Sequence, residues 1–343
     1  MNKEWQDFLA ARGARLEDGA VGDFGDIHAE RIATRDATVM CDLSQFGTLR
    51  VSGVDAQDFL QNLLSNDIRA VTPTQVQLSS LNSPKGRMLA SMLIWREGDD
   101  YILQLPQALC EPIRKKLTMY VLRANVQVTD VSEETVLLGL SGTTCVDVLQ
   151  AAYGELSHAT CSIVRSESGN LIKVGKTRWQ IATTRLHAVQ FWDFLRTSFR
   201  PAGSSCWDWL NIRSGIPVIL PQTREQFVAQ MVNFDLIDGV SFGKGCYPGQ
   251  EIVARTRYLG KLKRRMYLAH IDCAAAPMAG DELYSADMDG QASGMVVNSA
   301  ASPGGGYDVL AVVQISSIGA HPVCIGSLQG APLSFQALPY TLT

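Results

Sequence analysis

The order in which strand-like and helix-like patterns follow one another constrains the fold of this chain more than any other feature. Alternating apolar residues predict strands at 46–52, 76–82 and 87–95, and an amphipathic stretch predicts a helix over 106–122. Helices and strands alternate irregularly along the whole chain, without the spacing of parallel βαβ units. The sequence therefore predicts an α+β fold with antiparallel sheets, and it argues against a doubly wound parallel sheet.

The character of the sequence changes after Lys261, where helical patterns give way to short strand-like runs separated by glycine-rich turns. These runs lie near 263–271, 282–285, 291–298, 308–315 and 322–326. A length of 343 residues suits two or three domains. We expect one region over 1–245 with two interlocked α+β subdomains that divide near 125–135, a motif helix and linker over 246–262, and a small β-barrel over 263–343.

Composition excludes several classes of protein. The chain carries 30 basic and 34 acidic residues, a net charge of −4 and a pI near 5.8, which excludes a uniformly basic nucleic-acid-binding coat. No stretch approaches the ~20 consecutive apolar residues of a membrane-spanning helix. The first thirty residues lack the apolar core of a secretory signal and contain several acidic side chains. We therefore expect a cytoplasmic protein without a membrane partner.

The cysteines are scattered along the chain. There are eight of them, and no two are closer than 16 residues, so no C-x-x-C pair is present. The five histidines are equally dispersed, and metal sites usually need ligands at short spacing. We expect reduced thiols and no tightly bound metal.

The segment around Cys246 is the most informative part of the sequence. Glycines flank the cysteine, Pro248 suits the first position of a helix, and Glu251 suits the first turn. These features predict a helix of about ten residues that begins immediately after Cys246. A helix N-terminus and the nearby Lys244 would both favour thiolate over thiol, which indicates a reactive cysteine. The alternative, that Cys246 is a buried small hydrophobe, stays open.

A basic run follows this segment. No acidic residue lies between Glu251 and Asp272, and six cations lie within eleven positions, namely Arg255, Arg257, Lys261, Lys263, Arg264 and Arg265. In a globally acidic chain, such a concentration indicates a site for an anion such as polyglutamate, phosphate or an RNA backbone. A solvated strand edge protected by cations is the alternative interpretation.

Residues 244–251 read K-G-C-Y-P-G-Q-E and resemble the K-G-C-Y-x-G-Q-E motif of the YgfZ family of folate-binding proteins. These proteins are relatives of the glycine-cleavage T-protein, an aminomethyltransferase. Further segments resemble the family at 41–47, 51–56, 64–67 and 211–217, and the tail after Lys261 resembles its C-terminal β-barrel. Only about 140–200 is weakly covered by the resemblance.

The resemblance implies a T-protein-like, folate-binding region over 1–245 and a central channel that holds tetrahydrofolate or a derivative. It also implies an accessory role in building or repairing iron–sulfur clusters in client enzymes, including enzymes that modify tRNA. The family's functional thiol corresponds to Cys246. The residues that we expect to contact the cofactor are Lys244, Tyr247, Gly249, Gln250, Glu251, Arg255, Arg257 and Arg213.

Two departures from the T-protein bear on catalysis. Leu89 and Ala90 stand where the T-protein carries carboxylates, and apolar side chains cannot accept a proton. Arg213 stands where the T-protein has a Glu that accepts hydrogen bonds from the pterin, and arginine offers only donors. We therefore expect no turnover by this chain itself. The alternatives are a folate-dependent one-carbon transferase and an RNA-binding module, in which the run at 255–265 would make weak contacts with RNA.

Overall fold

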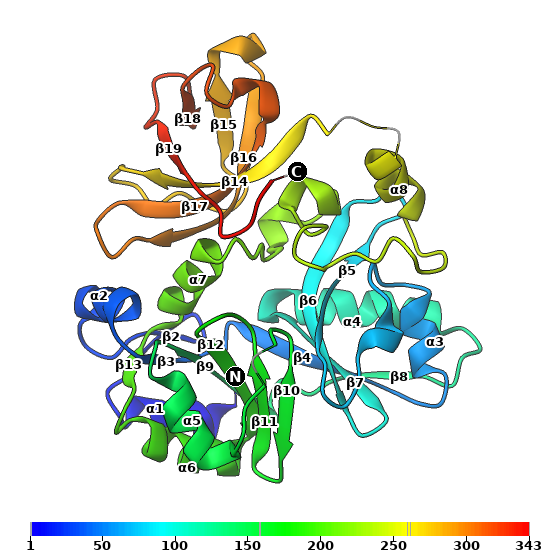
Figure 1. The fold of residues 1–343 in the computed structure, drawn as a ribbon, viewed down its shortest axis with the longest axis vertical. Coiled ribbons are helices and arrows are strands. Elements are labelled where there is room, and N and C mark those ends of the chain that lie inside the picture. Colours follow the sequence, from blue (N-terminus) through cyan, green and yellow to red (C-terminus); the bar gives the residue numbers. More distant parts are fainter. Residues whose placement is uncertain (1, 158, 259, 261, 343) are drawn as a thin grey trace. The chain divides into compact units, whose positions relative to one another are not determined.

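The computed structural model describes residues 2–157, 159–258, 260 and 262–342, and Figure 1 draws its fold. The described chain forms two compact units, each assembled from separate parts of the sequence. Unit 1 contains the chain up to Ala56, Arg69–Gln77 and Leu93–Trp207. Unit 2 contains Gln57–Ile68, Leu78–Met92 and the chain from Asp208 onward. The domain boundaries expected near 125–135 and over 246–262 stay predictions.

The first sheet of unit 1 has six strands in the order β10-β11-β12-β9-β3-β13. Their bounds are, in that order, Ile163–Ser166, Gly169–Lys173, Arg178–Thr184, Thr135–Ser141, Val39–Asp42 and Arg200–Ala202. β13 pairs parallel with β3, and the other neighbours pair antiparallel. The same unit holds the hairpin strands β1 (Arg15–Glu17) and β2 (Ala20–Asp23) and the helices α1 (Lys3–Ala10), α2 (Ile27–Asp36), α5 (Cys145–Tyr153) and α6 (Arg185–Leu195). A core rich in aromatic rings, including Trp5, Trp179, Trp192 and Phe199, stabilises this part.

The second sheet has five strands in the order β5-β6-β7-β4-β8. Their bounds are Gln77–Asn82, Met88–Glu97, Asp100–Pro106, Phe46–Ser52 and Gln127–Asp130. The sequence boundary between the two units falls after Met92, within the residues of β6. Helix α4 (Gln107–Val121) packs against β4, β7 and β8. The strands predicted at 46–52, 76–82 and 87–95 and the helix predicted over 106–122 are thus confirmed.

The C-terminal part of unit 2 is a single curled sheet in the order β18-β15-β16-β17-β14-β19. Its strands are Val323–Ile325, Glu282–Ser285, Ala292–Ala301, Tyr307–Gln314, Arg264–Ile271 and Leu333–Gln336. All neighbours pair antiparallel, and a bridge between Cys324 and Pro332 brings the two edge strands together. The glycine-rich turn at 302–306 joins β16 to β17. The predicted all-β module is confirmed as a six-stranded half-barrel around an aliphatic core.

Short helical segments lie between the strands along the chain (Figure 1). They are α3 (Ala56–Gln61), α7 (Ser204–Arg213), α8 (Gln250–Tyr258) and the 3-10 turns η1 (Ile68–Ala70), η2 (Pro221–Thr223), η3 (Ala229–Val232), η4 (Ala286–Met288) and η5 (Ile315–Ser317). Between η3 and α8 the chain is a series of turns and bends. The irregular stretch predicted over 235–249 is therefore confirmed. This stretch contains Cys246 and lies within unit 2.

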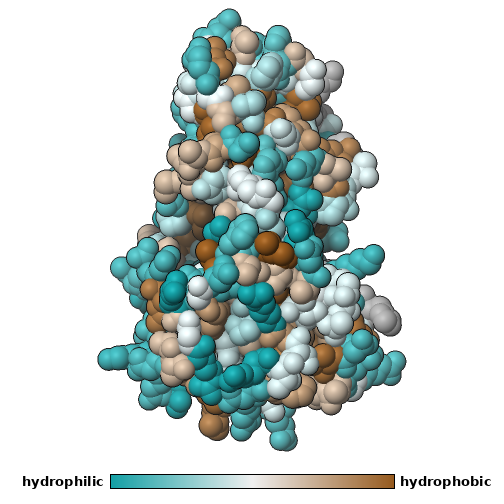
Figure 2. Space-filling model, turned by 90° about the vertical axis from the view of Figure 1, so that its left-hand side faces the viewer, coloured by the Kyte–Doolittle hydropathy of each residue, from teal (hydrophilic) through white to brown (hydrophobic). Residues whose placement is uncertain are grey.

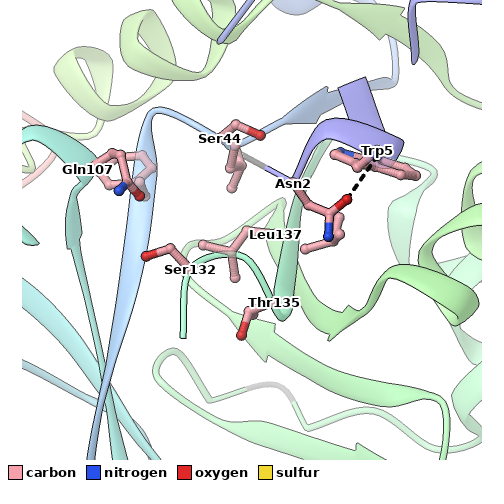
Figure 3. Close-up of a pocket in the computed structure, with 10 residues that line it drawn as sticks. Asn2, Trp5, Ser44, Gln107, Ser132, Thr135 and Leu137 are labelled. Carbon is pink, nitrogen blue, oxygen red and sulfur yellow. Dashed lines mark hydrogen bonds between the residues drawn. The ribbon is translucent and has the colours of Figure 1, made fainter. Parts of the chain in front are cut away.

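Asp42, in the family-like segment 41–47, carries a buried carboxylate. Asp42 Oδ1 accepts a hydrogen bond of 2.7 Å from Trp5 Nε1, and Oδ2 accepts one of 3.1 Å from the Ser44 amide. Burial raises the pKa of this carboxyl. The adjoining cavity, about 10 Å³ and bordered by Asn2 and Ser132, has room for about one water (Figure 3). Two hydrogen bonds therefore hold the Asp42 carboxylate inside unit 1.

None of the helices in the described ranges is both long and apolar enough to cross a bilayer. On the face drawn in Figure 2, hydrophilic residues are widespread and hydrophobic residues are scattered among them. Isolated exposed side chains such as Val54 and Leu122 are ordinary for a protein surface.

Candidate functional site

Cys246 is more exposed than the other cysteines of the described chain. All eight cysteines lie within the described ranges; Cys246 alone is exposed, Cys161 and Cys273 are half-buried, and the other five are buried. Burial raises the pKa of the Cys110 and Cys145 thiols to about 12, which keeps them protonated at neutral pH. The alternative interpretation of Cys246 as a buried small hydrophobe is therefore wrong.

The helix that follows the cysteine starts later than the sequence predicts. α8 begins at Gln250, four positions after Cys246. A turn comes first, because the Gln250 amide donates to the Tyr247 carbonyl at 3.1 Å. Gly249 has φ +78°, a left-handed conformation that a right-handed helix does not contain. The predicted helix is present, but its predicted start directly after Cys246 is wrong, and the thiol lies on a loop that precedes the helix.

Lys244 is buried, and its ammonium group donates to backbone carbonyls of the same protein. Nζ donates to the carbonyl oxygens of Gln61 and Leu64 at 2.6 Å and of Asn66 at 3.1 Å. It also lies 5.1 Å from the centre of the Tyr247 ring. An ammonium has three donors, and three carbonyls receive them. Lys244 thus ties the cysteine loop to the end of α3 and the turn beyond it.

Two further motif residues support the same loop. Gln250 Nε2 donates to the carbonyls of Lys244 at 3.4 Å and Gly245 at 3.3 Å. Tyr247 is buried, and burial raises its pKa to about 12. Gln250 therefore holds the two peptide groups immediately before the cysteine, and Tyr247 fixes the chain immediately after it.

The turn at Gly249 packs backbone to backbone against the hairpin between β5 and β6. A Cβ atom at Gly249 would lie 2.5 Å from Gly86 Cα and 2.6 Å from the Ser83 carbonyl oxygen, so no larger residue fits. On β6, the next strand, Leu89 and Ala90 are buried. The two side chains that the resemblance sets against the T-protein's carboxylates are thus apolar and buried.

The basic run contains exposed cations and cations that bond to other parts of the protein. Arg255 and Arg257 are exposed on α8, as is Glu251, and the Arg257 guanidinium lies 3.9 Å from the centre of the Phe242 ring. Lys263 is exposed, whereas Lys261 lies outside the described residues.

The cations that bond within the protein are Arg264 and Arg265, at the start of β14. Arg265 is buried and pairs with Asp235 at 3.2 Å, and Arg264 donates to the Ala292 carbonyl at 3.1 Å. Arg265 is therefore not available to an external anion, because it is buried and paired within unit 2. An anion site formed by the other cations of the run stays a prediction.

Arg213 has different neighbours from the cysteine loop. Its Nη1 lies 3.8 Å from Asp308 Oδ2 and hydrogen-bonds the side chain of Gln336. The same carboxylate accepts a 2.8 Å hydrogen bond from Trp209 Nε1 and pairs with His270 Nδ1 at 2.8 Å. In Figure 1, α7 and α8 lie apart. Arg213 therefore lies where α7 meets β17 and β19.

Three buried amide side chains of unit 2 were missed by the sequence analysis. Among the described residues, Asn82 Nδ2, Gln230 Oε1 and Asn233 Oδ1 have no hydrogen-bond partner. All three side chains are at least nine-tenths buried, and unsatisfied buried polar groups are rare in native proteins. A lone Asn or Gln has no motif, so no local signal in the sequence could have found them. Within the described ranges, no group of three or more His, Cys, Asp and Glu side chains is arranged to hold a metal ion.

Comparison with known proteins identifies the family. The family model described as the GCVT N-terminal domain matches residues 20–184. The tRNA-modifying protein YgfZ of Escherichia coli O157:H7 (strain EC4115 / EHEC) is 30% identical over 243 residues, which cover 70% of this chain and 74% of that protein. The chain belongs to the YgfZ family. A second YgfZ, from Shigella boydii serotype 18 (strain CDC 3083-94 / BS512), is 29% identical over the same shares.

A solved structure confirms the fold of this YgfZ-family chain. The glycine cleavage system aminomethyltransferase T from Bartonella henselae superposes with a TM-score of 0.76, covering 97% of this chain and 96% of that one. The sequence identity is 17%, so the likeness establishes the fold and not the activity. The predicted T-protein-like fold is therefore confirmed for this member of the YgfZ family.

Proposed function

We propose that this protein is a folate-binding accessory factor that supports the assembly or repair of iron–sulfur clusters in client enzymes, including enzymes that modify tRNA. The observation that carries the proposal is the single exposed thiol, Cys246, within a segment that reads K-G-C-Y-P-G-Q-E. An exposed thiol beside buried, anchored neighbours is suited to chemistry with a partner. A cytoplasmic location is part of the proposal.

The proposed cofactor is tetrahydrofolate or a derivative, as membership of a T-protein-like family suggests. The unpaired amide atoms of Asn82, Gln230 and Asn233 include both a donor and acceptors, which fits a pteridine edge that carries both. The exposed cations Arg255 and Arg257 fit the carboxylates of a polyglutamate tail. Bound tetrahydrofolate would supply nitrogen atoms that carry one-carbon units.

We propose that the chain has no aminomethyl-transfer turnover of its own. Leu89 and Ala90 are buried and apolar, so they can neither accept a proton nor stabilise a developing positive charge. This distinguishes an accessory factor from the alternative of a folate-dependent one-carbon transferase.

The role of Cys246 is tested by complementation of cells that lack their own family member. We expect Cys246→Ala to fold normally, because the side chain is exposed and contributes little packing, and to abolish support of iron–sulfur enzymes. The measurement is the level of a modified nucleoside made by such an enzyme, with purified variants compared by thermal unfolding. Cys273→Ala, which removes a half-buried thiol, is the control and should complement fully. Full complementation by Cys246→Ala would contradict the proposal.

The role of the exposed arginines is tested by calorimetry with two ligands. We expect Arg255→Ala combined with Arg257→Ala to weaken polyglutamylated tetrahydrofolate about five-fold, since exposed ion pairs contribute about 0.2–1 kcal/mol each. Monoglutamyl folate should lose little affinity, because it lacks the extra carboxylates. Arg196→Ala, which removes an exposed cation of unit 1, is the matched control. Equal losses for both ligands would show that α8 does not bind the tail.

A further inference from the structure

We propose that Gln250 and Lys244 are positioning residues, which hold the loop of Cys246 in one conformation and do not contact folate themselves. This deepens the proposed function and rests on its assignment of Cys246 as the working thiol. It revises the sequence-based expectation that both residues bind the cofactor. The geometry of residues 244–250 points to it in three steps.

The first step is the burial pattern of the loop. Lys244 and Tyr247 are buried, whereas Gly245 and Cys246, which lie between them, are exposed. No atom from outside its immediate neighbours would lie within 4 Å of a Cβ atom at Gly245. Side-chain packing therefore fixes the two ends of this short arch, residues 244–247. The exposed middle of the arch can be held only by hydrogen bonds.

The second step concerns those hydrogen bonds. The carbonyls of Lys244 and Gly245, which directly precede the cysteine, both accept from Gln250 Nε2, at 3.4 and 3.3 Å. An amide nitrogen carries two hydrogens, so one side chain can serve both carbonyls. Gln250 is the first residue of α8. The side chain that holds these two carbonyls therefore extends from a helix and not from another loop.

The third step concerns the far end of the arch. The Lys244 ammonium donates to Gln61, Leu64 and Asn66, a segment about 180 positions away in the sequence. Its donors are therefore directed at the protein. The cation acts on Cys246 through the backbone that it anchors, and the thiol stays exposed between two fixed points.

The test compares Gln250→Ala and Gln250→Glu in the full chain by hydrogen exchange and by calorimetry with tetrahydrofolate. Glutamate keeps the shape but cannot donate when ionised, so it separates a lost hydrogen bond from lost packing. We expect amide exchange over 243–249 to quicken about ten-fold in both variants, while folate affinity stays within about two-fold of the natural protein. Lys85→Ala, an exposed change in the same unit, should alter neither measurement. Unchanged exchange, or a large loss of folate affinity, would overturn the proposal.

A second measurement then asks whether Gln250 acts through the thiol. We expect Gln250→Ala to reduce support of iron–sulfur enzymes by about three-fold or more and to change the rate at which iodoacetamide alkylates Cys246 by a similar factor, since the thiol would no longer be held in one conformation. Lost support with an unchanged alkylation rate would show a separate role for Gln250 and contradict the inference. If Cys246→Ala itself retains full support, the proposed function fails, whereas the exchange result still decides whether Gln250 orders the loop.

Discussion

Lys244→Met should lower the free energy of unfolding by about 3 kcal/mol, although methionine is nearly as long and is apolar. Charge-assisted hydrogen bonds contribute about 1.5–3 kcal/mol each, and a buried acceptor left without its donor carries a further cost. Three carbonyls would lose the Lys244 ammonium together. Relief of the buried charge and the gain of apolar burial, about 1.5–3 kcal/mol for a methionine, offset only part of this loss.

Urea unfolding, followed by circular dichroism, measures this effect. Lys85→Met is the matched control, because Lys85 is exposed on the hairpin beside the cysteine loop in the same unit, and surface changes usually stay within about 0.5 kcal/mol. A loss below about 1 kcal/mol for Lys244→Met would mean that the three hydrogen bonds add little net stability. The anchoring argument for the cysteine loop would then fail as well.

Gly249→Ala should destabilise the protein by about 3 kcal/mol through two independent effects. The left-handed φ of +78° costs a residue with a Cβ atom about 1–2 kcal/mol. The new methyl group would also lie 2.5 Å from Gly86 Cα, and relief of such overlap with backbone costs about 1–3 kcal/mol. Because neither partner is a flexible side chain, the turn or the hairpin has to move.

Gly245→Ala, four residues earlier, provides the control for that prediction. A Cβ atom at Gly245 would have no atom within 4 Å beyond its chain neighbours, and Gly245 has no left-handed φ, so a methyl group there meets open space. We expect its unfolding midpoint in urea to match that of the natural protein. A Gly249→Ala variant as stable as Gly245→Ala would contradict the close approach of the turn to the β5–β6 hairpin.

The sequence predicts the elements whose signals are local. Strand β4 occupies 46–52, as its alternation indicates, and the strands β14 to β18 follow the short runs between glycine-rich turns. Strand β19 (Leu333–Gln336) was not predicted. Helix α2 was not predicted, because its buried face is Glu30, Ala33 and Thr34 and shows no apolar period. Glu30 is kept inside by the amides of Phe24 and Gly203, which donate to its carboxylate.

The candidate site was only half visible in the sequence. The letters around Cys246 identify the segment, yet nothing local shows that Lys244 reaches the carbonyls that follow α3. The late start of α8 has a similar cause. Pro248 and Glu251 favour an earlier start, but contact with Gly86 accompanies a left-handed Gly249. Contacts between distant segments decide such details, and a single sequence does not encode them in any spacing.

The interleaving of the two units limits how this protein can be dissected. A fragment beginning at Asp208 would contain Cys246, α8 and the half-barrel, yet it would lack Gln57–Ile68 and Leu78–Met92, which complete unit 2. The Lys244 ammonium would then have no carbonyl partners from Gln61, Leu64 and Asn66, and Gly249 would lose the hairpin against which it packs. No single cut of the polypeptide can isolate the thiol-bearing unit intact, so studies of Cys246 require the uninterrupted chain.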